Sequence, residues 1–252
     1  MIGWISNFGA AVIREVRGVG KFGLFSVQVL QKLAGARGRA VMQQIHFLGN
    51  GSLLIIAVSG LFVGFVLGLQ GYYTLVSYGS EQALGVLVAL SLVVTALLFA
   101  GRAGTALTAE IGLMRSGEQI AAMEMMGVDP FKQVLAPRFW GVFVAMPILA
   151  LIFSAVGILG AWLVGVGLIG TDNGAFWSQM QSSVDIFHDI ANGILKSIVF
   201  GVVIALVALF CGWSGRPTPE GVAHSTTRTV VTSSLLVLGV DFMMTAWLFT
   251  AF

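Results

Sequence analysis

Charged residues are scarce in this sequence, at 10% of 252 residues, while hydrophobic residues make up 57%. A soluble globular chain carries about 25% charged residues, so this composition excludes a soluble domain. Cysteine occurs once, as Cys211, which excludes an internal disulfide and indicates a thiol that packs in an apolar run. The N-terminus lacks a short apolar core followed by a small-residue cleavage site, so we expect no removable signal peptide.

The sequence also lacks the motifs of nucleotide and metal chemistry. The nearest match to a phosphate-binding loop runs from Gly18 to Phe22, but it lacks the first glycine and has Phe22 in place of the magnesium-binding hydroxyl. The three histidines are scattered and do not converge with carboxylates into a metal site. We therefore expect no catalytic residue, no metal and no cofactor, and the net charge of +2 gives no indication of nucleic-acid binding.

Long apolar runs predict an all-α integral membrane protein with five transmembrane helices in a single domain, residues 1–252. Each run is long enough for a span of about 20 residues. The predicted spans are 48–76, 83–107, 139–169, 194–213 and 230–252.

Residues 1–45 precede these spans and contain an amphipathic helix over about 4–33. Its apolar side chains follow one stripe, and Arg14, Arg17, Lys21 and Lys32 gather on the other side. This pattern predicts a helix that lies in the membrane interface, and the alternative is a soluble helix packed on a partner.

Basic residues also predict the orientation. Twelve of the thirteen fall on one side of the predicted spans, and only Lys196 falls on the other, where it is expected to extend outward at the start of its span. The positive-inside rule therefore places the N-terminus in the cytoplasm and Phe252 outside.

Glycines recur every four residues in the first predicted span, at Gly60, Gly64 and Gly68. Such a ridge allows another helix to approach closely. We expect these three glycines to face a neighbouring helix rather than lipid.

A polar segment, 101–138, separates the second predicted span from the third. Within it a short helix over about 116–128 is indicated, with Glu118 near its start and Gly127 followed by Asp129 at its end. We expect this helix to lie on the cytoplasmic side and to present its outer face to a partner, and the alternative is a simple connector.

Two features leave other functions open. Gly212-Trp213-Ser214-Gly215 has the shape of an intramembrane serine protease motif, but Ser214 is predicted at the cytoplasmic rim with only His224 nearby in the same loop. Asp241 lies eleven residues from each end of the last predicted span, hence near the bilayer centre. It is either a gating or proton-linked group, as in a secondary transporter, or a structural hydrogen-bonding group.

Three stretches resemble one known family. Residues 96–139, ALLFAGRAGTALTAEIGLMRSGEQIAAMEMMGVDPFKQVLAPRF, are similar to its central signature, and GLQG at 68–71 and STTRTVV at 225–231, leading to Asp241-Phe242, are similar to its flanking motifs. The chain is identified by this resemblance as a member of the MlaE-type permeases of ABC lipid transporters, which serve the Mla system of Gram-negative bacteria.

The resemblance implies a permease in the inner membrane that helps to maintain outer-membrane lipid asymmetry, with an interfacial helix and five spans. It implies a homodimer bound to cytoplasmic ABC ATPase subunits, which hydrolyse the ATP, together with STAS-domain proteins and a periplasmic hexamer of MCE-domain subunits. Phospholipid is expected in a cavity between the two permeases, with the C-terminus periplasmic. The residues implied in a coupling helix docked on the ATPase are Glu118, Gln119, Glu124, Met125, Met126 and Asp129. Those implied in lipid binding are Leu69, Gln70, Tyr73 and Tyr78.

The sequence departs from the family between Leu92 and Val93, where relatives carry an apolar residue followed by Arg-Glu-Leu-Gly-Pro. Six helical residues rotate the following chain by about 120° and lengthen a helix by about 9 Å. Because the signature beyond this point is intact, we expect Leu92 and Val93 to lie about 10 Å apart rather than at the 3.8 Å of bonded neighbours. The charged pair that is absent here would otherwise be a candidate for contact with lipid headgroups.

Overall fold

The computed structural model describes residues 2–77, 92–183 and 188–250, and within these ranges nearly every residue is helical and none lies in a β-strand. Four described helices are long and apolar enough to cross a membrane. They cover Gly38–Gly71, Phe131–Leu168, Ile190–Ser214 and Pro219–Trp247. The predicted all-α membrane class is confirmed.

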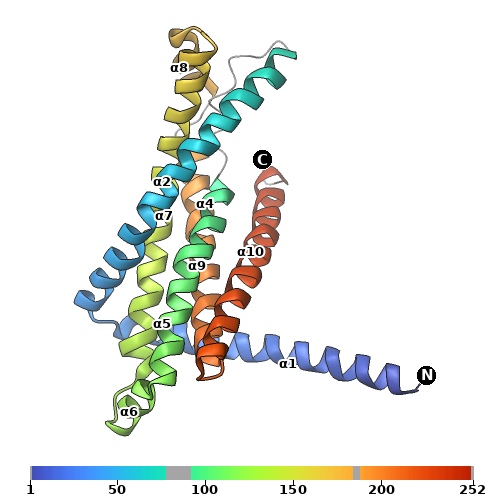
Figure 1. Ribbon diagram of the computed structural model, residues 1–252, viewed down its shortest axis with the longest axis vertical. Coiled ribbons are helices and arrows are strands. Elements are labelled where there is room, and N and C mark those ends of the chain that lie inside the picture. Colours follow the sequence, from blue (N-terminus) through green and yellow to red (C-terminus); the bar gives the residue numbers. More distant parts are fainter. Residues whose placement is uncertain (1, 78–91, 184–187, 251–252) are drawn as a thin grey trace.

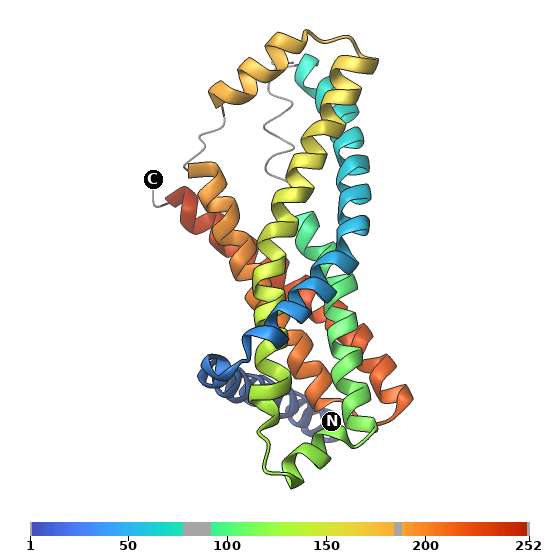
Figure 2. The same cartoon turned by 90° about the vertical axis from the view of Figure 1, so that its left-hand side faces the viewer.

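The helices are labelled in Figure 1. Their bounds are α1 Ile2–Lys32, α2 Gly38–Ser77, α4 Leu92–Phe99, α5 Thr105–Ser116, α6 Gln119–Met125, α7 Ala136–Trp162, α8 Asn173–Ser183, α9 His188–Ser214 and α10 Pro219–Thr250. A π-helical turn, Ala100–Gly104, joins α4 to α5, and two others, Phe131–Leu135 and Leu163–Leu168, extend α7 at its two ends. α2, α7, α9 and the α4–α5 rod run along the length of the molecule, with α8 near one end and α6 at the other (Figures 1 and 2).

The predicted glycine ridge forms the contact between α2 and α7. A Cβ atom added to Gly60 would lie 3.1 Å from the carbonyl oxygen of Phe153, and one added to Gly64 would lie 2.2 Å from that of Gly157. A Cβ atom on Gly68 would lie 3.2 Å from the Cβ of Val164. The three glycines therefore face another helix at close range, which confirms the prediction.

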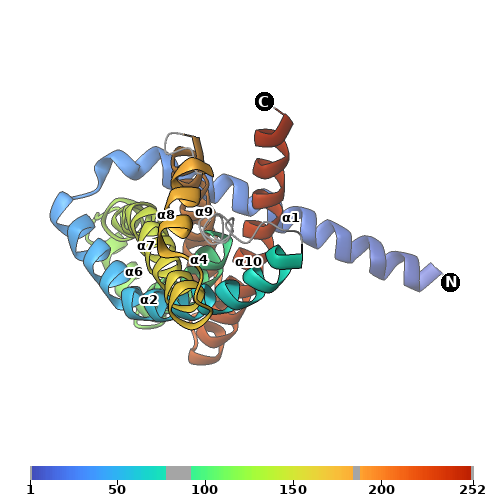
Figure 3. The same ribbon diagram turned by 90° about the horizontal axis from the view of Figure 1, so that it is seen from above.

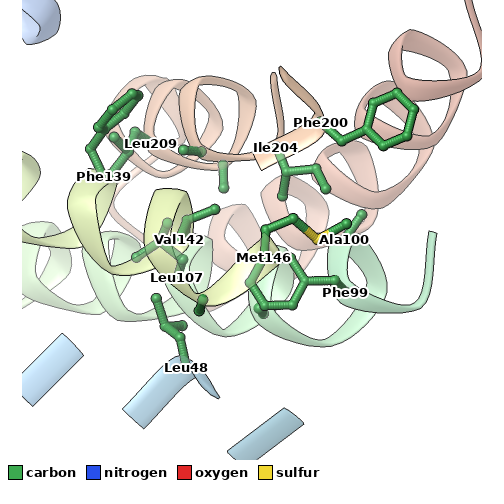
Figure 4. Packing of buried hydrophobic residues seen from close by; sticks show 14 of the residues in the cluster. Leu48, Phe99, Ala100, Leu107, Phe139, Val142, Met146, Phe200, Ile204 and Leu209 are labelled. Carbon is green, nitrogen blue, oxygen red and sulfur yellow. The ribbon is translucent and has the colours of Figure 1, made fainter. Parts of the chain in front are cut away.

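The core lies where the α4–α5 rod meets α7 and α9. Phe99 and Leu107 from the rod, Met146 from α7 and Ile204 from α9 are all completely buried (Figure 4). These apolar residues recur at helical spacing, so each helix turns one side into the shared centre. A polar contact, Thr108 Oγ1 to Thr229 Oγ1 at 2.8 Å, joins α5 to α10 beside this core.

α10 begins much earlier than the predicted span over 230–252. The helix starts at Pro219, where the Thr218 hydroxyl accepts the N–H of Gly221 at 3.1 Å. Pro is favoured in the first turn of a helix, because its missing N–H needs no partner there. The polar residues that follow are helical as well, and the Thr226 hydroxyl is satisfied within the helix because it donates to the carbonyl oxygen of Ala223.

The second predicted span, 83–107, lies partly outside the described residues, which resume at Leu92. From there the chain is a continuous rod to Ser116, nine residues beyond the predicted end. Leu92 and Val93 are successive residues of one α-helix. The expected 10 Å separation is therefore wrong, and the rod is continuous across the point where the family segment is absent.

α1 lies across the end of the bundle and projects away from it (Figure 3). Phe25 and Val29 of α1 are buried, while Arg17 and Lys21 are exposed. A helix is therefore present where one was predicted, and its buried apolar residues contact the bundle, while its place in the membrane interface stays a prediction. α8 occupies part of the loop between the third and fourth predicted spans.

Candidate functional site

The segment between the second and third predicted spans forms a compact turn at the end of the bundle. α5 ends at Ser116, Glu118 is left-handed with a φ of 56°, and α6 covers Gln119–Met125. Gly127, with a φ of 73°, follows the helix end and supplies the left-handed residue that a helix C-terminus favours. We call residues 117–130 the connecting segment.

The helix predicted over 116–128 is therefore shorter than expected. Gly117 ends α5, and the left-handed Glu118 separates α5 from α6. A non-glycine residue with positive φ is uncommon and persists only where its surroundings hold it. The polar segment 101–138 is not all connector, because α5 and the start of α7 extend the bundle through much of this range.

Most residues implied in coupling lie on the outside of the connecting segment. Ile120 is buried and anchors α6, whereas Met125 is 84% exposed. With Ile120 buried against the bundle, both the polar and the apolar side chains on the opposite face of α6 are exposed. The exposed members of the implied set are Glu118, Gln119, Glu124, Met125 and Met126.

Asp129 differs from these residues because its carboxylate is bound within the chain. Lys32 Nζ lies 2.7 Å from Asp129 Oδ2, and the Phe131 N–H donates to Asp129 Oδ1 at 3.0 Å. The hydrogen bond from Lys32 holds the pKa of the Asp129 carboxyl below its ordinary value. Asp129 therefore carries its negative charge at neutral pH.

A second ion pair fixes the helices on either side of the connecting segment. Arg138 of α7 donates from Nη2 to Glu110 Oε1 at 2.5 Å and from Nε to Glu110 Oε2 at 3.2 Å. Its Nη1 donates to the carbonyl oxygen of Val134 at 2.8 Å, and its side chain is only 9% exposed. Such bidentate geometry is the strongest form of this contact, so α5 and α7 are held together at the base of the segment.

Arg115 connects the same region to α9. Its Nη1 donates to the carbonyl oxygens of Trp213 and Gly215, at the C-terminal end of α9. A cation is favourable at a helix C-terminus, where carbonyl groups lack helical partners. Pattern reasoning missed the partners of Arg115 and Arg138, because they lie on helices remote in sequence.

The residues implied in lipid binding are only partly described. Leu69 and Gln70 are exposed near the end of α2 that lies opposite α6. The side chain of Tyr73 and the whole of Tyr78 lie outside the described residues. The described part of the chain therefore places two of the four side chains on one outer helix end.

Asp241 is paired with a residue of α9. Lys196 Nζ of α9 donates to Asp241 Oδ1 at 3.1 Å and to Thr245 Oγ1 at 2.7 Å, so Lys196 does not extend outward alone as expected. Because α10 begins at Pro219, Asp241 lies 22 residues from the start of its helix. The pairing of its carboxylate with α9 is what a structural group requires, and a gating or proton-linked role stays a prediction.

Within the described residues no cluster of three metal-ligating side chains occurs. Ser214 is exposed at the end of α9, and His224 is an exposed residue of α10. Neither is placed inside the predicted membrane region, as an intramembrane protease requires.

Comparison of the sequence with known proteins points to one family of permeases. The profile of the family described as Permease MlaE matches residues 41–247. The intermembrane phospholipid transport system permease protein MlaE of Haemophilus influenzae is 50% identical over 259 aligned positions, which cover 100% of this chain and 99% of that protein. A probable ABC transporter permease protein of Rickettsia typhi is 31% identical and covers 96% of each chain.

The protein TRIGALACTOSYLDIACYLGLYCEROL 1 of Arabidopsis chloroplasts is a more distant relative, 28% identical over 84% of this chain and 62% of its own length. The alignment with the Haemophilus protein is seven positions longer than the 252 residues of this chain. That alignment therefore contains at least seven positions with no counterpart in this chain.

Proposed function

Because the chain belongs to the MlaE family of permeases, we propose that it is the membrane-spanning permease of an ATP-driven phospholipid transporter. The permease itself is not an enzyme, and a separate ATPase subunit supplies the energy. One observation carries the proposal: the family match over 41–247 includes a short exposed helix, α6, held rigidly between two membrane helices.

The exposed face of the connecting segment is the docking site for the ATPase in this proposal. Glu118, Glu124 and Met125 are exposed, and neither glutamate has an ion-pair partner among the described residues. Ile120 anchors α6, and the Glu110–Arg138 pair braces its base. A load applied to α6 is therefore passed to α5 and α7 rather than absorbed by a slack loop.

The proposed membrane topology has five spans and one interfacial helix. The α4–α5 rod is the inner part of the second span, and the four long helices are the others. α1 projects sideways from the bundle (Figure 3). Its exposed apolar side chains follow one face of the helix, and the exposed Arg17 and Lys21 lie on another face. The exposed apolar residues spaced along one face are Val16, Val19, Val27 and Leu30.

The proposed setting is the bacterial inner membrane, with the N-terminus and α6 in the cytoplasm and the C-terminus in the periplasm. The charge distribution supports this orientation, because twelve of the thirteen basic residues then face the cytoplasm. Phospholipid would contact Leu69 and Gln70, with Tyr73 and Tyr78 as further expected contacts, at the outer end of α2. A homodimer, STAS-domain proteins and an MCE-domain hexamer complete the proposed assembly.

Charge reversal of α6 tests the docking proposal. Glu118→Lys together with Glu124→Lys should prevent co-purification of the ATPase subunit with the permease and abolish lipid-stimulated ATP hydrolysis. Glu220→Lys is the matched control, since Glu220 is an exposed acidic residue at the start of α10, on the same proposed side. An intact, lipid-stimulated complex that carries both reversals contradicts the proposal.

A further inference from the structure

The end of α1 contacts the connecting segment through a charged and aromatic cluster. Lys32 Nζ lies 2.7 Å from Asp129 Oδ2 and 4.8 Å from the centroid of the Phe131 ring. Lys32 therefore makes an ion pair and a cation–π contact at the same time. Trp140 adds a third link, because its Nε1 donates to the carbonyl oxygen of Leu33 at 3.2 Å.

Aromatic rings from three elements support this contact. The ring of Phe25, from α1, lies 5.9 Å from that of Phe131 and 6.4 Å from that of Trp213. Phe131 and Trp213 are 5.0 Å apart. These distances are those of favourable aromatic pairs, so α1, the start of the α7 rod and the end of α9 form one packed unit.

Both carboxylate oxygens of Asp129 are engaged inside this unit. Oδ2 contacts Lys32, and Oδ1 accepts the N–H of Phe131 directly before α7. Asp129 also precedes Pro130, the arrangement that favours the start of a helix. A carboxylate held on both sides by its own chain is poorly placed to be a docking contact like Glu118 or Glu124.

We propose that Asp129 is a positioning residue that acts through Lys32: the pair fixes the connecting segment to α1 and so sets the orientation in which α6 meets the ATPase. The inference rests on the proposed docking of α6, and it changes the role of Asp129 from a contact to a brace. It also gives α1 a role beyond lying in the interface, since α1 carries the other half of the brace.

Neutral substitutions separate the two roles of Asp129. Asn is as good a helix N-cap as Asp, so Asp129→Asn keeps the hydrogen bond to Phe131 and removes only the ion pair. Lys32→Gln removes the same ion pair from the other side, and with it the cation–π contact to Phe131. Lys21→Gln is the matched control, because it removes an exposed positive charge from α1 without a described contact to the connecting segment.

The first measurement is the lipid-stimulated ATPase activity of the whole complex in lipid nanodiscs. We expect each single substitution to lower stimulation about two- to fivefold, the range set by a partly exposed ion pair. The double substitution should be no worse than Lys32→Gln alone, because the ion pair is already absent in that variant. Lys21→Gln should leave stimulation unchanged.

The second measurement is a distance between spin labels on α1 and α6, at Gln28→Cys and Ala121→Cys, both exposed positions. Cys211, the sole native cysteine, is buried, so the labels report the introduced positions. The distance distribution should broaden in both Asp129→Asn and Lys32→Gln, and at least as much in Lys32→Gln, which also loses the contact to Phe131. A defect confined to the connecting segment would not broaden the distribution when the substitution is made in α1.

Two outcomes overturn the inference while the proposed function stands. In one, Asp129→Asn impairs stimulation and Lys32→Gln does not, which makes Asp129 a direct contact of the ATPase. In the other, neither substitution changes stimulation or the label distance, although reversal of Glu118 and Glu124 detaches the ATPase. Retention of the ATPase by that reversed variant overturns the docking proposal itself and the inference with it.

Discussion

Replacement of Gly64 by alanine is the most direct perturbation of the α2–α7 contact. The added Cβ would lie 2.2 Å from the carbonyl oxygen of Gly157 and 3.1 Å from the backbone nitrogen of Ala161. Carbon and oxygen atoms approach to about 3.3 Å even in the closest favourable contacts, so the two helices must part by about 1 Å. Because the obstructing atoms belong to the backbone, no side-chain rotation relieves the clash.

The expected cost follows from two opposing effects. Overpacking of this kind destabilises a protein by about 1–3 kcal/mol, and separation at Gly64 also loosens the contacts at Gly60 and Gly68. Alanine in place of glycine gains up to about 1 kcal/mol of helix propensity. We therefore expect Gly64→Ala to lower the free energy of unfolding by about 1–2 kcal/mol.

Gly239→Ala on α10 is the matched control, since a Cβ atom at Gly239 has no neighbour within 4 Å. It should leave the free energy of unfolding unchanged or raise it by up to about 1 kcal/mol. The measurement is reversible unfolding of the purified protein in mixed micelles, followed by circular dichroism. Equal stability of the two variants refutes the close approach of α2 and α7 at Gly64.

Two ion pairs give the remaining predictions. Asp241→Leu should lower the free energy of unfolding by up to about 3 kcal/mol or impair transport, because it leaves Lys196 partly buried without its carboxylate partner. Asp241→Asn should have a milder effect, since asparagine keeps a hydrogen-bond acceptor for Lys196. Lys196→Met in the Asp241→Leu background should restore stability, and a lone leucine variant with wild-type unfolding and lipid transport contradicts the prediction. Glu110→Gln should lower the free energy of unfolding by about 1–3 kcal/mol, because the Arg138 side chain is only 9% exposed while solvent screens the Glu110 side chain, which is 35% exposed. The exposed control Glu220→Gln should change the free energy of unfolding little. Equal free energies of unfolding for Glu110→Gln and Glu220→Gln would show that the Glu110–Arg138 pair does not stabilise the fold.

Much of the helical framework follows from local pattern. Long apolar runs indicate spans because backbone groups in lipid must be satisfied within a helix, and the spacing of Gly60, Gly64 and Gly68 indicates a helix contact. The start of α10 could not be found this way. Thr and Ser favour turns in many contexts, because their hydroxyls compete for backbone groups, so a stretch rich in them does not reveal the helix that the structure shows from Pro219.

Some features of the candidate site could likewise be predicted from the sequence, and others could not. Exposure of Glu118 and Glu124 follows from a polar run between two spans, and the structure places both outside. The partners of charged residues could not be predicted, because they depend on which helices pack together. Lys196 and Asp241 lie 45 residues apart in sequence, and hydropathy shows only that each charge requires a partner, without identifying it.

The attachment of α1 at one end gives this helix mechanical leverage. Lys32 and Phe25 hold its C-terminal part against the bundle, while the rest of its 31 residues, about 46 Å of helix in all, extends beyond (Figure 3). The part that precedes Phe25 is about 35 Å long, so a tilt of about 10° would carry its far end through about 6 Å, a fifth of the thickness of the hydrocarbon core. With α1 in the interface and α6 docked on the ATPase, as proposed, small movements of α6 would be amplified into a deformation of the surrounding leaflet, and membrane tension acting on α1 would act back on α6.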